Sequence, residues 1–136
     1  MLKVCAAIII HNNKILITQR SSKMKLPMSW EFPGGKINDN ETPEECIKRE
    51  IYEELNIGIK IIEKFHINYH NYDFGEICLI SFLALWESGK LLLNEHEKYL
   101  WVKKDELENF DFAPADRPAV DRLIRKKSLK NTDELV

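Results

Sequence analysis

The sequence lacks the features that mark membrane proteins, nucleic-acid-binding proteins and repeat proteins. No apolar run approaches the roughly 20 residues that a membrane-spanning helix requires. The formal net charge is −2, so no overall positive field is available to hold a nucleic acid polymer. Internal repeats, linkers and low-complexity tracts are absent. Because 136 residues are enough to bury a core, we expect a single domain over residues 1–128 and a frayed tail over 129–136.

Cysteine is scarce and odd in number. Cys5, Cys46 and Cys78 lie in apolar or helical segments, which is typical of reduced core thiols. This pattern argues against a disulfide set, a zinc site or a nucleophile. The first residues, MLKVCAAIII, also lack the small-residue cleavage pattern of a signal peptide. We therefore expect a cytoplasmic protein with no membrane partner, present as a monomer or a homodimer.

The chain alternates between strand and helix patterns. Apolar runs bounded by turn residues predict strands over 3–10, 14–19, 30–33, 57–68, 75–86, 91–93 and 99–102. Helical spacing predicts a helix over 43–55, a short helix or turn over 103–110 and a final helix over 118–127. We interpret the strands between residues 57 and 93 as an antiparallel meander.

The helix over 43–55 has recognisable boundaries. Thr42 is a suitable N-cap, Pro43 suits the first helical position, and Glu45 completes a capping box. Asn56 tolerates the left-handed conformation that commonly ends a helix. We therefore expect the helix to end at Leu55.

Three glutamates crowd one arc of this helix. Glu50, Glu53 and Glu54 lie three or four residues apart, so their carboxylates approach one another beside the apolar stripe. They lie in the second half of the helix, where the macrodipole is negative, and Arg49 alone cannot neutralise them. The arc is either a solvated acidic face or a site where carboxylates bind a hard cation such as Mg²⁺.

The stretch around the helix resembles the Nudix box, the signature of the Nudix hydrolases. That pattern is Gly, five residues, Glu, seven residues, Arg-Glu-aliphatic, any residue, Glu-Glu, any residue, Gly-aliphatic. The matching residues are Gly35, Glu41, Arg49, Glu50, Ile51, Glu53, Glu54 and Ile57. The second glycine of the pattern is replaced by Asn56, and asparagine is the next-best residue for a positive φ.

The resemblance implies a Nudix fold of the α/β (α+β) class. In that fold a mixed sheet separates the box helix from the C-terminal helix. The resemblance also implies Mg²⁺, with Mn²⁺ as an alternative, held by the Gly34 carbonyl and by Glu50, Glu53, Glu54 and Glu95. Arg49 is expected to orient the glutamates, while Glu41 is expected to order the loop. Glu53, Glu54 and Glu95 remain alternative general bases.

The loop before residue 99 is a second informative stretch. In MutT-type members of the family, a glutamate six residues before a tryptophan closes over the metal site. Glu95 stands six residues before Trp101, and Glu97 is a near neighbour. The alternative is an exposed acidic loop. His96, between the two glutamates, is expected to be solvated.

The chain looks like the MutT-type branch from about residue 3 to 126, with WEFPGGK before the box and FAPAD near the C-terminus. That branch converts nucleoside triphosphates to monophosphate and pyrophosphate. It includes enzymes that clear 8-oxo-dGTP and enzymes that act on CTP and dCTP. The resemblance implies substrate contacts at Arg20, Glu31, Phe32, Lys36 and Asp116. Arg20 and Lys36 would bind phosphate, with a solvated strand end as the alternative for Arg20.

Asp116 departs from the 8-oxo-dGTP pattern, in which an asparagine reads the base. An ionised aspartate accepts hydrogen bonds but cannot donate one to guanine O6, which favours a CTP-type preference. An N-cap for the last helix is the alternative role for Asp116. A different class of function is a Nudix-like module that binds nucleotides without hydrolysis. Such modules usually lose glutamates of the box, and this sequence keeps them all.

Overall fold

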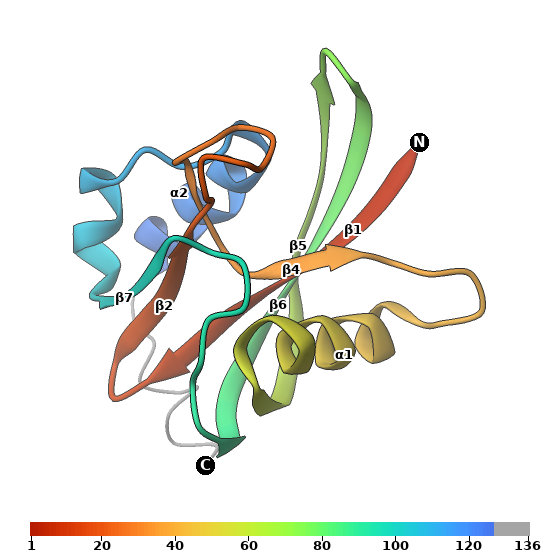
Figure 1. Cartoon of the computed structure of the whole chain (residues 1–136). Helices are drawn as coiled ribbons and strands as arrows, with labels where there is room; N and C mark the ends of the chain where they lie inside the picture. The colour runs from red at the N-terminus through yellow and green to blue at the C-terminus, as the bar shows by residue number, and fades with distance from the viewer. Residues whose placement is uncertain (127–136) are drawn as a thin grey trace.

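Strand β1 (Leu2–His11) lies at the centre of a mixed sheet (Figure 1). The structure is a computed structural model that describes residues 1–126, and the tail predicted over 129–136 lies outside the described residues. β1 runs parallel to β6 (Gly75–Gly89) on one edge. The antiparallel strands are β2 (Lys14–Gln19), β3 (Trp30–Glu31), β4 (Gly34–Lys36), β5 (Ile57–Tyr72) and β7 (Lys98–Val102). Of these, β3 and β7 flank β2, while β5 pairs with β6.

Two strands, β2 and β4, share the second edge of β1. β4 pairs with residues 4–6 of β1, whereas β2 pairs with residues 10–11. Where they part, the N–H of Ala7 donates to Pro33 O at 2.8 Å. β2 and β4 therefore pair with separate parts of the same edge of β1, and Figure 1 shows β2 turning away from β4.

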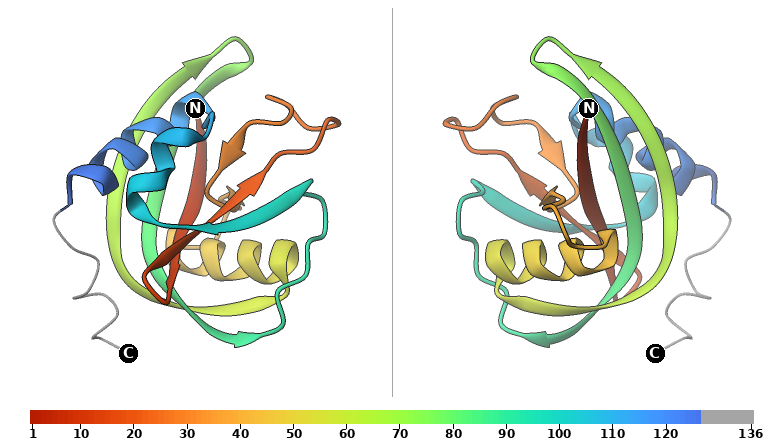
Figure 2. Two further views of the ribbon diagram at one scale, coloured as in Figure 1. Left: turned by 90° about the vertical axis from the view of Figure 1, so that its left-hand side faces the viewer. Right: turned by 90° about the vertical axis from the view of Figure 1, so that its right-hand side faces the viewer.

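Helices cover both faces of the sheet, as the fold prediction requires (Figure 2). β1 is buried on both sides because its apolar residues alternate between two cores. Cys5, Ala7 and Ile9 pack with α1 (Pro43–Leu55). The intervening residues pack with α2 (Arg117–Arg125) and with the 3₁₀ helix over Lys104–Asn109. A second 3₁₀ turn, Pro114–Asp116, leads directly into α2.

The strand predicted over 91–93 is not formed, so the predicted three-stranded meander is wrong. Residues 90–97 instead run without strand structure along the end of α1. The N–H of Leu92 donates to Leu55 O at 3.0 Å, and the N–H of Asn94 donates to Glu54 O at 3.1 Å. The carbonyl groups at the C-terminus of α1 thus accept hydrogen bonds from backbone N–H groups that would otherwise pair with a neighbouring strand. The strand predicted over 57–68 is also longer than expected, because β5 continues to Tyr72.

All three cysteines are buried and free, as expected of core thiols. None of the helices within residues 1–126 is long and apolar enough to cross a membrane.

Candidate active site

Both ends of α1 are held by the residues that the sequence predicts. Thr42 Oγ1 accepts the N–H of Glu45 at 3.1 Å, and Glu45 Oε1 accepts the N–H of Thr42 at 2.8 Å. The predicted capping box is therefore confirmed. Asn56 takes the left-handed conformation, with φ at 61°. The helix ends at Leu55, which places the three glutamates in its C-terminal half.

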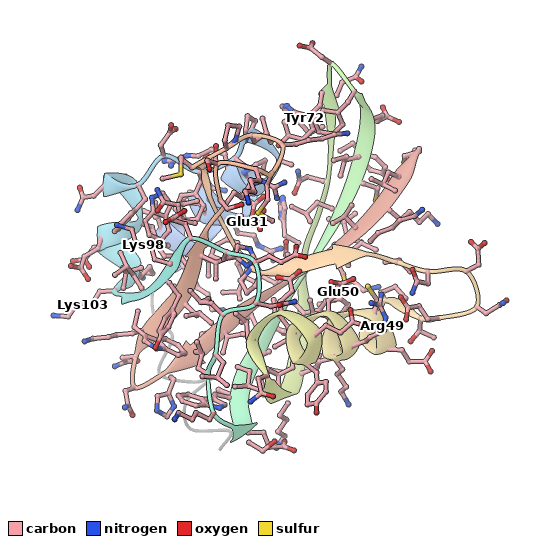
Figure 3. The ribbon with its side chains drawn as sticks, viewed as in Figure 1. Glu31, Arg49, Glu50, Tyr72, Lys98 and Lys103 are labelled. Carbon is pink, nitrogen blue, oxygen red and sulfur yellow. The ribbon has the colours of Figure 1, made fainter. Side chains whose placement is uncertain are left out.

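Arg49 links the loop before α1 to two glutamates of the helix. Its Nε and Nη2 donate to the two carboxylate oxygens of Glu41 at 3.0 and 2.7 Å. Its Nη1 donates to Glu50 at 2.9 Å and to Glu53 at 3.3 Å. The bond from Arg49 lowers the pKa of Glu41 to about 2. Figure 3 shows Arg49 beside Glu50, on the side of α1 that faces β4.

The two glycines of β4 permit close approach to the backbone. A Cβ on Gly34 would lie 1.9 Å from Cys5 O, so a side chain does not fit between these strands. A Cβ on Gly35 would lie 2.3 Å from Cδ of Glu50. Gly35 therefore lets the Glu50 carboxylate lie directly against β4.

Glu54 faces a different set of residues. Glu31 Oε1 accepts from Arg20 Nη1 at 2.8 Å, and Glu31 Oε2 lies 2.8 Å from His96 Nε2. The other ring nitrogen of His96, Nδ1, lies 3.7 Å from Glu54 Oε2. These four side chains bring together β2, β3, the loop over 90–97 and α1.

His96 is buried, so the prediction of a solvated side chain is wrong. Only 1% of its side chain is exposed. Its loop is tied to α1 through Asn94 and to β2 through the N–H of Glu97, which donates to Gln19 O at 2.8 Å. The loop therefore turns His96 inward and leaves Glu95 exposed. No sequence signal marks this position, because a single inward residue in an irregular loop follows no periodicity.

The environment of Glu54 disfavours its negative charge. Burial is the main reason that its pKa rises to about 9, and the charges of Glu31 and Glu50 add to the effect. Glu54 Oε2 and His96 Nδ1 are both buried without a hydrogen-bond partner. An unpartnered carboxylate oxygen among like charges is a position where a cation would be stabilised. The oxygens of Glu50, Glu54 and the Gly34 carbonyl are hard donors of the kind that suits Mg²⁺.

The carboxylates are not arranged as a ready-made metal centre. Among residues 1–126, no three His, Cys, Asp or Glu side chains converge as a metal-binding group. Arg49 engages one oxygen of Glu50 and both oxygens of Glu53. The second oxygen of Glu50 is therefore not engaged by Arg49, whereas both oxygens of Glu53 are.

Two adjoining cavities lie where the sheet divides. The larger, about 410 Å³, has apolar walls from Val4, Ile77 and Leu79, among others. The smaller, about 130 Å³, extends to Gly34, Gly35 and Glu54, and the two share Val4, Arg20, Glu31, Leu79 and Asp116 as lining residues. All five predicted substrate contacts line one or both cavities: Arg20, Glu31, Phe32, Lys36 and Asp116. Figure 3 shows Glu31 between the hairpin that carries Tyr72 and the helix that carries Glu50.

The hairpin of β5 and β6 supplies a wall of the larger cavity that the sequence analysis missed. The rings of Tyr72 and Phe74 stack with centroids 4.9 Å apart, and Lys25 Nζ lies 4.2 Å from the centroid of Phe74. The Tyr72 hydroxyl accepts the N–H of Ala115 at 2.8 Å. Aromatic rings at positions 70, 72 and 74 are the period-two signal that could have revealed this face.

Asp116 is buried at the meeting point of the two cavities. Its Oδ2 accepts the N–H of Phe32 at 2.9 Å, and its side chain makes no capping bond to α2. Asp116 thus occupies the predicted N-cap position of α2, but its side chain does not cap the helix. Burial, with the charge of Glu31, raises its pKa well above the usual range. This rise favours the neutral carboxyl, which can donate as well as accept a hydrogen bond.

Comparison with known proteins identifies the family of this chain. The model of the NUDIX domain matches residues 1–123. The chain belongs to the Nudix hydrolases. It is 36% identical to an 8-oxo-dGTP diphosphatase of Buchnera aphidicola subsp. Schizaphis graminum, over 80% of this chain and 82% of that protein. It is 30% identical to a CTP pyrophosphohydrolase of Escherichia coli K12, over 98% of each chain.

Solved structures of this family share the fold. The solution structure of the E. coli ORF135 protein has 30% identity and a TM-score of 0.78, covering 94% of this chain and 95% of its own. A MutT Nudix protein from methicillin-resistant Staphylococcus aureus 252 has 41% identity and a TM-score of 0.74, covering 90% and 95%. The mixed sheet with helices on both faces is thus the Nudix fold.

Proposed function

We propose that this Nudix hydrolase converts nucleoside or deoxynucleoside triphosphates to monophosphate and pyrophosphate. Water would attack one phosphorus in a reaction that depends on Mg²⁺, or on Mn²⁺ in its place. The proposed role is to remove oxidised nucleotides such as 8-oxo-dGTP from the cytoplasmic pool. The relatives named as an 8-oxo-dGTP diphosphatase and a CTP pyrophosphohydrolase support this substrate class.

One observation carries the proposal. A cavity of about 410 Å³, with an apolar wall that includes Val4, Ile77 and Leu79, adjoins, through Arg20 and Glu31, a smaller cavity that reaches Glu54. An apolar wall suits a nucleobase, and clustered carboxylates suit a cation bound to phosphates. The shared boundary gives a nucleotide one orientation, with its base in the larger cavity and its phosphates toward α1.

The roles of the residues follow from their positions. We assign the Gly34 carbonyl, Glu50, Glu53 and Glu54 to the metal. Glu95, exposed on its loop, is assigned as a further ligand or as the general base. When bound, the metal would neutralise phosphate oxygens and acidify the attacking water.

The surrounding residues would position the substrate and the ligands. Arg49 would hold Glu50 and Glu53 through the bonds described above, which fixes their approach to the ion. Arg20, which lines both cavities, and Lys36, which follows Gly34 and Gly35 on β4, would bind phosphate oxygens. Phe32 and Asp116, joined by a hydrogen bond, would contact the base.

A preference for CTP or dCTP is the second candidate. It is favoured by the relative that matches almost the whole chain, and by the carboxyl of Asp116, which can accept from the cytosine amine. The raised pKa of Asp116 also allows it to donate to guanine O6, so the 8-oxo-dGTP activity stays our first candidate.

A pyrophosphate-release assay over 8-oxo-dGTP, dGTP, dCTP and CTP tests the proposal. We expect Mg²⁺-dependent turnover that is fastest with 8-oxo-dGTP. Faster turnover of CTP or dCTP would favour the second candidate. Tight binding without release of pyrophosphate would identify a non-catalytic nucleotide-binding module and overturn the proposal.

A further inference from the structure

His96 is buried between two carboxylates of the site, yet the function proposed above gives it no role. Its Nε2 lies 2.8 Å from Glu31 Oε2 and its Nδ1 lies 3.7 Å from Glu54 Oε2. Almost none of its side chain is exposed. A histidine surrounded in this way has both ring nitrogens directed at acidic groups rather than at water.

The two contacts of His96 differ in kind. The bond to Glu31 is of ordinary length and is part of a chain that continues to Arg20. The contact with Glu54 is longer than a hydrogen bond, and the atoms on both sides of it are buried without a partner. The first contact anchors the loop over 90–97, whereas the second leaves a polar nitrogen beside a carboxylate that our assignment gives to the metal.

The loop over 90–97 also connects two proposed metal ligands, Glu54 and Glu95. Asn94, two residues before His96, donates its N–H to the Glu54 carbonyl, and Glu95 immediately precedes His96. A shift of His96 would therefore displace Glu95 and would remove the side chain that limits where the Glu54 carboxylate can lie. Residues that hold a ligand from behind in this way tune metal binding in many proteins.

We propose that His96 is a positioning residue that holds the Glu54 carboxylate in place for the divalent ion and fixes the loop that carries Glu95. The inference rests on the proposed function, because it assigns Glu54 to the metal. It extends that function by making the loop over 90–97, through one histidine, part of the metal-binding apparatus.

Direct Mn²⁺ binding, measured from the free-ion signal in electron paramagnetic resonance, tests the inference independently of activity. We expect His96→Ala to weaken Mn²⁺ binding by about 10–100-fold, the usual range when a residue behind a ligand is removed. With a hydrolysed nucleotide, we expect kcat to fall while KM changes little. His66→Ala, on β5 near Arg122 and Arg125, is the matched control and should bind Mn²⁺ like the wild type.

His96→Gln separates positioning from simple structural support. Its amide nitrogen can replace Nε2 in the bond to Glu31, but it places no second nitrogen beside Glu54. We expect this variant to keep the thermal stability of the wild type and still bind Mn²⁺ weakly. Wild-type Mn²⁺ affinity in His96→Gln would overturn the inference, and this comparison stands even if His96→Ala fails to fold.

The outcomes for the wild type separate the two proposals. Wild-type protein that binds Mn²⁺ but hydrolyses no nucleotide would overturn the proposed function, while the variants would still decide the role of His96. Wild-type protein that binds no Mn²⁺ would overturn the role of His96 as well.

Discussion

Glu53 and Glu54 are adjacent on α1, but they lie in opposite environments. Glu53 is 55% exposed and is bonded to Arg49, whereas Glu54 is 20% exposed and has an oxygen without any partner. Arg49, whose positive charge offsets the negative charge of Glu53, belongs to the same helix. Arg20, which lines the same cavity as Glu54, is bonded to Glu31 instead. Two identical neighbours thus differ because only one faces a cavity, and Glu54 is the position where an added cation would be stabilised most.

Glu53→Gln and Glu54→Gln should have the largest effect on turnover, and the two losses should be similar in size. Each removes a proposed ligand or base, so we expect turnover to fall by about 10²–10⁴-fold in both variants. The measurement is kcat for the best nucleotide of the panel, with circular dichroism as the control for folding. Near-normal turnover in one variant would exclude that glutamate from the reaction and sharpen the difference between them.

Gly35→Ala should act on the same helix through Glu50. The added methyl group would lie 2.3 Å from Cδ of Glu50, and that flexible side chain can move away at little cost in stability. We expect turnover to fall by about 10–100-fold with nearly unchanged thermal unfolding, because a ligand is displaced but no core contact is lost.

Gly58→Ala is the matched control for this substitution. There the new methyl group would meet only the hydroxyl of Ser88, at 2.5 Å, away from the carboxylates. Equal losses of turnover in the two alanine variants would show that the close approach of Gly35 to Glu50 has no special importance.

In the metal-free protein, Glu41 and Glu54 should make the folding stability change with pH in opposite directions. Glu54 has a pKa of about 9 against an ordinary 4.5, so its folded form holds a proton that the unfolded chain releases. Its contribution to stability is full below pH 4.5 and is lost as the pH rises toward 9. Glu41, with a pKa of about 2, contributes above pH 4.5 and loses this contribution as the pH falls toward 2.

Urea unfolding in a chelator, from acid to alkaline pH, checks these two slopes. We expect Glu54→Gln to flatten the fall in stability between pH 4.5 and 9, by at most about 1.4 kcal/mol per pH unit, and Glu41→Gln to flatten the fall on the acid side. Parallel profiles for the wild type and Glu54→Gln would show that Glu54 ionises normally in the folded protein.

Asp116→Asn should have the smallest effect, on substrate ranking alone. An amide oxygen can still accept the N–H of Phe32, so we expect the fold to be retained. The ratio of kcat/KM between 8-oxo-dGTP and dCTP should change by about 10-fold, the scale of one hydrogen bond. An unchanged ratio would leave Asp116 as a support for Phe32 and remove it from base recognition.

The part of the site on α1 could be predicted because its geometry is local. Residues three or four apart on a helix share a side, and Thr42, Glu45 and Asn56 mark where that helix begins and ends. The two glycines before the helix are visible in the sequence, but the sequence did not reveal that Gly35 accommodates the side chain of Glu50.

The buried cluster could not be predicted in the same way. Glu31 and His96 are 65 residues apart in the sequence, and Phe32 and Asp116 are 84 apart. No periodicity connects positions at such separations, because each contact depends on how the sheet divides and where the loop over 90–97 lies. For the same reason the burial of His96 reversed an expectation based on residue type, and the burial that raises the pKa of Asp116 could not be predicted.

The sequence by itself determined the helix that carries the carboxylates, its boundaries and the charge gathered along it, since hydrogen bonding and side-chain direction within one helix are local. Only the tertiary structure decided which carboxylate is compensated and which is not. That difference depends on burial and on the distance to Arg49, Arg20 and His96, and these are set when β2, β3, the loop and α1 pack around one cavity.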